Sequence, residues 1–366
     1  METEPPQAIL NFYYEQLFPY SAVYDWLDLS KITGRYYSGQ REIAFFNSQD
    51  FVKRYCEAAN VEEFRRLFKF YEPRQVHVGA VYDKHFSQKS EHNHIAGKEF
   101  VVDLDICDYD AIRTCNCPCD SFCPQCWNFM IVAAKCLELQ FKENFGWKNW
   151  QWMFSGSKGL HCWIRESLPS NFTSRNRMLT AKFLNKKRKK TSLPDKLLYK
   201  NILKGYFEDF LLCDYELFEN PIACQYLCSY LPPSTIDFSI KPKEKTSVEF
   251  WECFYEQISL SFSKKEAKEI KKDLAFKFLY PRLDYNVSAD AQHLIRCPFS
   301  VHPKTGNLVV PVASSELNNI FEVIKETHIY RVLPSTIDYY SGVLRDSILT
   351  ADLRLGGHER RILGLL

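Results

Sequence analysis

The sequence lacks long apolar runs and has almost no net charge. No segment approaches the ~18 uninterrupted apolar residues that a membrane-spanning helix needs. The first residues, METEPPQAILNFYYEQLF, also lack the basic start and apolar core of a secretory signal, so we expect a soluble, intracellular protein. With 47 Lys and Arg against 45 Asp and Glu, the net charge of +2 gives no general attraction to nucleic acid, so any surface that binds it must be local.

Apolar residues, in contrast, are plentiful. Hydrophobic residues make up 46% of the 366 positions and aromatic residues 15%, which is enough for a large core and predicts two lobes rather than one compact unit. The chain also has 14 cysteines. In a reducing compartment these are more often free buried thiols or metal ligands than disulfides, so their distribution along the chain is the informative feature.

The spacing of apolar residues changes along the chain, without an internal repeat. Residues 8–29 have helical spacing interrupted at the tripeptide FPY, which predicts two helices. Period-2 and β-branched runs predict strands within residues 41–55 and 74–82. Residues 166–272 are rich in Lys, Leu, Phe and Glu at helical spacing and predict a helical insertion, after which strand-like sequence resumes at Lys277.

Polar and basic segments interrupt these elements. Residues 185–190, 241–247 and 263–274 are Lys-rich, and each is either a solvated loop or helix face, or a contact for nucleic acid or a nuclear import signal. His92 and His94 in SEHNHIAGKEF are consistent with a polar loop, with metal binding as the alternative.

Two carboxylates share one face of a predicted strand. In EFVVDLDICDYD, alternation places Asp103 and Asp105 on one face and the apolar residues Val102 and Leu104 on the other. Repulsion between neighbouring carboxylates is relieved by a cation, and Mg²⁺ typically takes one or two carboxylates and completes its shell with water and phosphates. The alternative interpretation is a solvent-facing pair at a sheet edge.

A third carboxylate lies far along the chain. Asp284 lies in FLYPRLDYNVS, a strand-like apolar run, between Arg282 and Asn286. Three carboxylates suit a two-metal nucleotidyltransferase, in which one ion lowers the pKa of the attacking hydroxyl and the other binds the triphosphate.

A glycine-containing turn offers groups for phosphate. WQWMFSGSKGLHCWI predicts strand, tight turn and strand, with Gly156 and Gly159 allowing close approach of the backbone. Ser155, Ser157 and Lys158 supply hydroxyls, amides and one cation. An ordinary β-hairpin is the alternative.

Further basic groups follow. His161 and Trp163 share a face of the second predicted strand. HLIRCPFSVHPKTG supplies Arg296, His302 and Lys304 soon after Asp284, although a surface loop with a turn at PKTG has the same pattern.

Five cysteines cluster directly after the carboxylate strand, in CNCPCDSFCPQC: Cys115, Cys117, Cys119, Cys123 and Cys126. The CxxC pair Cys123 and Cys126 suits one side of a tetrahedral ion, and two upstream thiolates would complete a closed structural Zn²⁺ site. Five candidates for four positions leave one cysteine over. We expect Cys115, Cys117, Cys123 and Cys126 to be the ligands, with Cys119 as the alternative to Cys117.

These motifs, in this order, resemble those of the eukaryotic primase small subunit in the archaeo-eukaryotic primase superfamily. The resemblance rests on VVDLDICDYD, CPQCW, FSGSKGLHCW, PRLDYNVS and HLIRCPFSVHPKTG, with FYYEQLFPYSAVYDWL and GQREIAFF near the N-terminus. It covers roughly residues 10–165 and 276–310, and it implies an α/β (α+β) catalytic domain with a mixed sheet and an RRM-like core, a structural zinc motif and a helical subdomain. The expected domains are residues 1–165, with zinc motif 115–126, residues 166–272, and residues 273–366.

The resemblance also assigns roles to residues. It implies that Asp103, Asp105 and Asp284 are catalytic and bind Mg²⁺ or Mn²⁺. The residues implied to bind the nucleotide are Glu42, Ser155, Ser157, Lys158, His161, Arg282, Arg296 and His302. The family turn commonly reads SGRRG, whereas SGSKG has Ser157 and Lys158 in place of two arginines, and an ammonium lacks the guanidinium fork for bidentate phosphate contact.

The implied function is template-directed synthesis of short RNA primers from ribonucleoside triphosphates on single-stranded DNA. The implied partners are a primase large subunit, forming a heterodimer, and the replicative DNA polymerase alpha complex in the nucleus. A metal-dependent phosphohydrolase and a non-catalytic, zinc-stabilised nucleic-acid-binding module are the alternatives.

Overall fold

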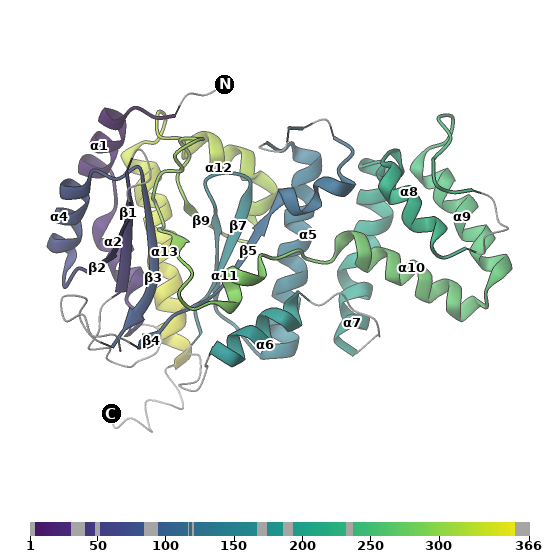
Figure 1. The fold of residues 1–366 in the computed structure, drawn as a ribbon, viewed down its shortest axis with the longest axis horizontal. Coiled ribbons are helices and arrows are strands. Elements are labelled where there is room, and N and C mark those ends of the chain that lie inside the picture. Colours follow the sequence, from purple (N-terminus) through teal and green to yellow (C-terminus); the bar gives the residue numbers. More distant parts are fainter. Residues whose placement is uncertain are drawn as a thin grey trace. The chain divides into compact units, whose positions relative to one another are not determined.

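The computed structural model describes residues 4–30, 41–47, 52–83, 94–115, 117–118, 121–166, 174–185, 193–231 and 237–355. The chain divides into two compact units (Figure 1). The sheet unit contains Met1–Asp103, Trp147–Phe183 and Asp284–Leu366, and the helical unit contains Leu104–Gly146 and Leu184–Leu283. Among the described residues, no helix is both long and apolar enough to cross a membrane.

The described residues of the sheet unit form two sheets. The first has the strands β1 (Arg41–Phe46), β2 (Val52–Cys56), β3 (Gln75–Tyr82), β4 (Ile95–Gly97) and β8 (Ile295–Arg296). Their order is β2-β1-β3-β4, with β8 also paired to β3, and the pairs are antiparallel. The strands expected within residues 41–55 and 74–82 are confirmed.

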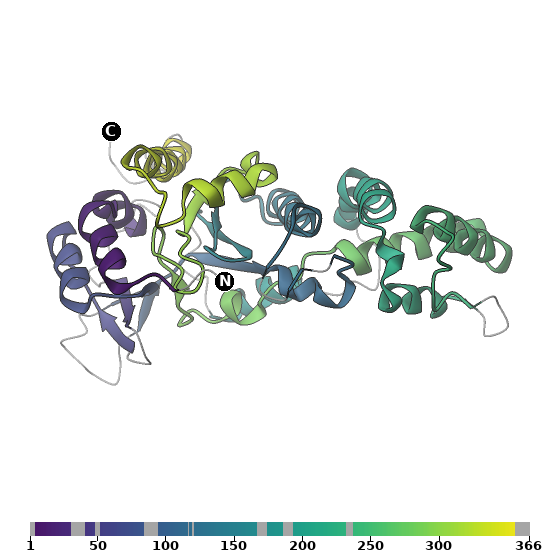
Figure 2. The ribbon, with the colours of Figure 1, turned by 90° about the horizontal axis from the view of Figure 1, so that it is seen from above.

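Aromatic packing holds three helices of the sheet unit together: α1 (Gln7–Gln16), α2 (Tyr20–Leu27) and α4 (Val61–Tyr71). The ring of Phe68 on α4 lies 5.3 Å from Phe45 on β1, 5.2 Å from Tyr14 on α1 and 4.8 Å from Phe18. Pro19, which has no backbone N–H, is the N-cap of α2 and separates the two predicted N-terminal helices, which are confirmed. Figure 2 shows these purple helices on one side of the first strands.

The second sheet has the order β5-β7-β6-β9. Its strands are β5 (Phe100–Asp105), β6 (Trp150–Phe154), β7 (Gly159–Ile164) and β9 (Val310–Val312). The expected hairpin is confirmed, since β6 and β7 pair antiparallel with Met153 opposite His161. Trp26 on α2 packs against Trp163 on β7 at 4.9 Å between centroids and donates a hydrogen bond to Ser347 on α13 (Pro334–Leu355).

A buried ion-pair cluster lies at the start of β5. Glu99 accepts hydrogen bonds from Arg41 at 2.8 and 2.9 Å and from Arg165 at 3.3 Å. Burial opposes the charge of Glu99, but the two arginines hold the pKa of its carboxyl below the ordinary value. Arg177 on α6 (Ser174–Leu184) donates to the backbone oxygens of Lys98 and Glu99. The strand that carries the candidate carboxylates therefore begins at a fixed point.

Helices make up the second unit. They are η2 (Ile106–Ile112), α5 (Pro124–Gln140), η3 (Phe141–Phe145), α7 (Leu193–Leu198), η4 (Tyr199–Leu203), η5 (Tyr206–Asp214), η6 (Leu217–Glu219), α8 (Pro221–Cys228), α9 (Ser247–Ser261) and α10 (Lys264–Leu279). Capping boxes begin α9 at Thr246 and α10 at Ser263, as Ser/Thr-x-x-Glu sequences favour. Phe129 on α5 packs against Tyr109, Phe210 and Tyr215. The helical character expected after residue 166 is confirmed.

The strand expected from Lys277 is wrong. Helix α10 continues to Leu279, because Leu274, Phe278 and Leu279 bury one helical face. Pro281 disfavours helix at the residue before it, and Tyr280 is extended with ψ 139°. Asp284 accordingly does not lie on a strand but is the N-cap of the short helix α11 (Tyr285–Ala289).

The two units divide the chain differently from the three expected domains. Residues 104–146, expected to belong to the first catalytic range, cluster with the helical unit. After β5 the chain continues into η2, which packs with α5 and α8, and then into α5, which packs with α7, η4 and α10. Residues 147–183 belong to the sheet unit. The expected domain boundaries stay a prediction.

Candidate active site

The carboxylates of β5 alternate with buried residues, as the sequence predicts. Val102 and Leu104 are fully buried, whereas Asp103 and Asp105 are partly exposed. Asp105 ends the strand as the N-cap of η2, where its Oδ1 accepts a hydrogen bond of 2.8 Å from the Cys107 amide. The strand therefore presents one carboxylate from its interior and one from its end.

Asp284 lies beside Asp103, although 180 residues separate them in sequence. The Asp284 amide donates to the Asp103 carbonyl oxygen at 3.1 Å, and Ser288 on α11 donates to the Val101 carbonyl at 2.8 Å. Two hydrogen bonds therefore fix α11 to β5. The Asp284 side chain is exposed, and its Oδ1 accepts from the Asn286 amide at 2.8 Å.

A histidine adjoins the first carboxylate. His161 on β7 is buried, with its Nε2 atom 3.7 Å from Oδ1 of Asp103. Burial, with smaller effects of Arg296 and His302, lowers the pKa of His161 to about 3. His161 is therefore neutral near pH 7, and the contact with Asp103 is not an ion pair.

The turn between β6 and β7 is ordered by its own serine. Ser155 Oγ accepts from the amides of Gly159 at 3.2 Å and Ser157 at 3.4 Å, while Ser157 and Lys158 are partly exposed. Gly156 has φ +82°, which favours glycine, and a Cβ there would lie 3.0 Å from the His302 Cβ. The two predicted phosphate-binding segments therefore pack directly on each other.

Cations gather around His302. Arg296 on β8 is partly buried and donates from Nη1 to the Ser155 carbonyl at 2.8 Å. Burial, together with smaller effects of the positive charges of Arg296, Lys304 and Lys158, lowers the pKa of His302 to about 3. Burial also lowers the pKa of Arg296 to about 10, against the opposing effect of Asp103. Positive groups from both segments thus lie in the same unit as two of the carboxylates.

Two expected nucleotide ligands have other partners. Glu42 on β1 is fully buried and accepts from Arg54 at 2.8 and 3.2 Å and from Tyr82 at 3.5 Å. Arg282 lies in the helical unit, where its guanidinium donates to the Asp108 carbonyl and lies 4.7 Å from the centroid of the Tyr109 ring. Each of these two side chains therefore has partners within its own unit.

The cysteines converge in the helical unit, at the N-terminus of α5. The Sγ atoms of Cys115, Cys117, Cys123 and Cys126 all lie within 4.8 Å of one another, and those of Cys123 and Cys126 are 3.7 Å apart. Tetrahedral Zn²⁺ with bonds of ~2.3 Å would separate its sulfurs by ~3.8 Å, which this cluster fits. Cys119 and His92 lie outside the described residues. His94 is exposed and belongs to no metal-type group within the described chain.

Arg113 and Tyr215 border this cluster. Burial opposes ionisation of the Cys115 thiol, but hydrogen bonds from Arg113 and from Cys117 lower its pKa to about 6. The Tyr215 hydroxyl lies 3.9 Å from Cys115 Sγ. Because a metal binds the thiolate, these neighbours favour the liganding form. Within the described ranges, the four cysteines are the only group of three or more metal-type ligands this close; the aspartates form no such closed set.

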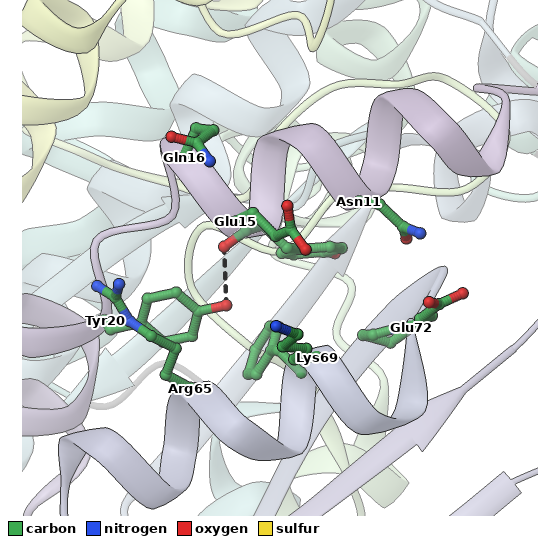
Figure 3. A pocket seen from close by; sticks show the side chains of 10 residues that line it. Asn11, Glu15, Gln16, Tyr20, Arg65, Lys69 and Glu72 are labelled. Atoms are coloured by element: carbon green, nitrogen blue, oxygen red, sulfur yellow. Dashed lines mark hydrogen bonds between the residues drawn. The ribbon is translucent and has the colours of Figure 1, made fainter.

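A separate cavity lies between α1 and α4 (Figure 3). It has a volume of about 250 Å³, and its lining includes Tyr14, Tyr20, Arg65 and Lys69, with the Tyr20 hydroxyl donating to the Tyr14 carbonyl at 2.8 Å. None of the expected site residues lines it.

Sequence reasoning missed Thr305, whose hydroxyl donates to the Gly156 carbonyl at 2.5 Å. It also missed Tyr13 and Tyr14 on α1, which bond to the backbone of Phe299 and Val301 just before His302. The turn sequence PKTG marked the position of Thr305, but no local pattern indicates a partner 149 residues away.

Residues 102–314 match the family described as DNA primase small subunit. The DNA primase small subunit of Schizosaccharomyces pombe is 30% identical over 327 residues, 82% of this chain and 71% of the relative. That of Saccharomyces cerevisiae is 30% identical over 340 residues, 85% and 82% respectively. The chain therefore belongs to the DNA primase small subunit family. A weaker likeness, with a TM-score of 0.39 and 13% identity, covers 95% of this chain and 91% of a polymerase domain from Mycobacterium tuberculosis ligase D in complex with DNA.

Proposed function

We propose that this chain is the catalytic subunit of a DNA primase, a DNA-directed RNA polymerase that makes short RNA primers from ribonucleoside triphosphates on a single-stranded DNA template. Family membership supports this proposal. The observation that carries it is the backbone bond that places Asp284 beside Asp103, in the unit where Lys158, His302 and Arg296 gather.

Each group then has a role. Asp103, Asp105 and Asp284 would hold two divalent ions, Mg²⁺ or Mn²⁺, which when bound favour ionisation of the attacking 3′ hydroxyl and stabilise charge on the triphosphate. Lys158 and the Ser157 hydroxyl would bind phosphate oxygens, and Arg296 holds that turn through the Ser155 carbonyl.

Neutral His161 next to Asp103 is suited to hydrogen bonding with the nucleotide rather than to charge pairing. We retain His302, Ser155, Ser157, Arg282 and Glu42 as nucleotide-binding residues. The contacts of Ser155 and Glu42 support positioning roles, since the first orders the turn amides and the second is paired with Arg54.

The cysteine cluster would hold one Zn²⁺. Four thiolates from Cys115, Cys117, Cys123 and Cys126 leave no open position for substrate, so its role would be structural. We propose a primase large subunit as heterodimer partner, association with the DNA polymerase alpha complex, and action in the nucleus.

The test is incorporation of labelled ribonucleotides by the purified chain on single-stranded DNA, with and without the large subunit and with metal chelation. We expect product only with template and divalent metal. A phosphohydrolase would release phosphate without template, and a binding module would retain DNA without incorporation; either result would overturn the proposal.

A further inference from the structure

Two turns of the sheet unit are joined by one side-chain hydroxyl. The hairpin turn, Ser155–Gly159, carries Ser157 and Lys158, and the histidine turn, His302–Asn307, carries His302 and Lys304. The Thr305 Oγ1 donates to the Gly156 carbonyl at 2.5 Å.

Thr305 is itself fixed within the histidine turn. Its hydroxyl accepts from the Asn307 amide at 3.3 Å, and its own amide donates to Nδ1 of His302 at 3.3 Å. Nε2 of His328 lies 3.0 Å from the Thr305 carbonyl. The hydroxyl therefore reaches Gly156 from an anchored backbone rather than from a mobile side chain.

The hairpin turn is thereby held at two successive carbonyls. Arg296 donates to the carbonyl of Ser155, and Thr305 donates to that of Gly156. Gly156 itself lies in the left-handed region at φ +82°, and a Cβ there would lie only 3.0 Å from that of His302. Because Lys158 follows Gly156 by only two residues, displacement of the Gly156 carbonyl would move the cation.

We propose that Thr305 is a positioning residue for the nucleotide: its hydroxyl locks the hairpin turn onto the histidine turn, so that Lys158 and the Ser157 hydroxyl meet the triphosphate as one preformed surface. This inference rests on the proposed primer synthesis. Phosphate held by such a surface is bound equally before and during reaction, so loss of the lock weakens substrate binding rather than the chemical step.

Two substitutions at Thr305 separate the effect of its hydroxyl from the effect of its side-chain volume. Thr305→Val keeps the volume but removes the bond, whereas Thr305→Ser keeps the bond and removes a methyl group. On a primed oligo(dT) template with Mn²⁺, we expect Thr305→Val to raise the KM for ATP roughly three- to tenfold with kcat within about twofold. Thr305→Ser, which keeps the hydroxyl, should have a KM for ATP close to that of the wild type.

Thr246→Val is the matched control. The Thr246 hydroxyl accepts from the Glu249 amide at 3.2 Å as the N-cap of α9, in the helical unit, so its loss should lower the melting temperature without changing the KM. An unchanged KM in Thr305→Val, or an equal rise in Thr246→Val, would overturn the inference.

A double-mutant cycle with Lys158→Ala tests whether Thr305 acts through the hairpin turn, even if Thr305→Val also lowers the stability of the protein. If Thr305 acts through the hairpin turn, its substitution should change the KM little once Lys158 is gone. Effects that multiply independently would contradict this role. Wild-type protein without template-dependent incorporation would instead refute the proposed function.

Discussion

At the scale of single residues, two of the three aspartates also begin helices. Asp105 Oδ1 accepts from the Cys107 amide and Asp284 Oδ1 from the Asn286 amide, each at 2.8 Å. Asparagine keeps this acceptor oxygen and caps helices about as well as aspartate, but it lacks the charge that binds a divalent cation. Metal binding and helix capping can therefore be separated by one substitution.

We predict that Asp103→Asn, Asp105→Asn and Asp284→Asn each lower primer synthesis by about two orders of magnitude or more, with melting temperatures close to wild type. Incorporation assays and thermal unfolding would check this. The control is Asp237→Asn, at an exposed turn where Oδ1 accepts from the Ser239 amide at 2.8 Å. Normal synthesis in any of the three variants would remove that residue from the catalytic set.

Ser157 is the residue at which the hairpin turn departs from the SGRRG pattern. It is partly exposed, so a longer side chain has room, and Lys158 is already next to it. We predict that Ser157→Arg lowers the KM for ribonucleotides several-fold with little change in kcat, because a forked donor adds charge-assisted hydrogen bonds to phosphate. Steady-state kinetics with Ser157→Gln as the uncharged control would measure this, and a KM that stays the same or rises would mean that other cations already suffice.

The alternation of residues and the order of the motifs identify the three carboxylates in the sequence. They do not predict which of these residues lie side by side in the folded chain. The exposure of Asp103 and Asp105 follows from a local period of two. The position of Asp284 depends on a bond to the Asp103 carbonyl, and that of Thr305 on a bond to Gly156, neither of which leaves a trace in nearby sequence. Contacts over such separations come from tertiary folding alone.

At the scale of elements, the local sequence best predicts where a helix or strand ends. Pro19 separates α1 from α2, and Gly156 and Gly159 bound the hairpin turn between β6 and β7. The strand predicted from Lys277 was wrong because a short apolar run contains no such end signal. A run of four or five apolar residues fits a buried strand and the end of a buried helix equally well. Burial by the rest of the helical unit decides between them.

The N-terminus of α5 is the element most dependent on metal. We predict that the purified chain contains about one Zn²⁺, and that Cys123→Ser with Cys126→Ser removes it and lowers the melting temperature, because metal binding contributes directly to folding of such sites. Elemental analysis and thermal unfolding would test this, with the buried Cys136→Ser as control for loss of a thiol outside the cluster. Zinc content unaffected by the double substitution would contradict the site.

The same element distinguishes two ligand sets. Cys117 belongs to the cluster, whereas Cys119 lies outside the described residues. Because the Cys117 thiol lies in the cluster, we expect Cys117→Ser to lose more zinc than Cys119→Ser. The reverse order would make Cys119 the ligand in place of Cys117.

At the scale of the whole molecule, one buried and two partly buried histidines link folding to acidity. His77, His161 and His302 each have a pKa lowered from 6.5 to about 3, chiefly by burial. Their pKa values are lower in the folded than in the unfolded chain, so the unfolded chain binds more protons at acidic pH. The free energy of unfolding therefore falls as pH decreases from about 6.5, by about 1.4 kcal/mol per pH unit for each additional proton.

His77 tests this linkage away from the carboxylates. It lies on β3 opposite Arg296, its Nε2 atom is buried without a hydrogen-bond partner in the described structure, and the Phe46 ring lies 4.6 Å away. His77→Phe keeps an aromatic ring and removes the proton site. We predict that wild-type protein loses about 1–2 kcal/mol more stability than this variant between pH 6.5 and 5. Urea unfolding at both values would measure the difference, with zinc held constant and the exposed His94→Gln as control. Parallel pH curves for wild type and His77→Phe would mean that His77 is protonated in the folded chain, and that burial at this strand does not exclude the charge.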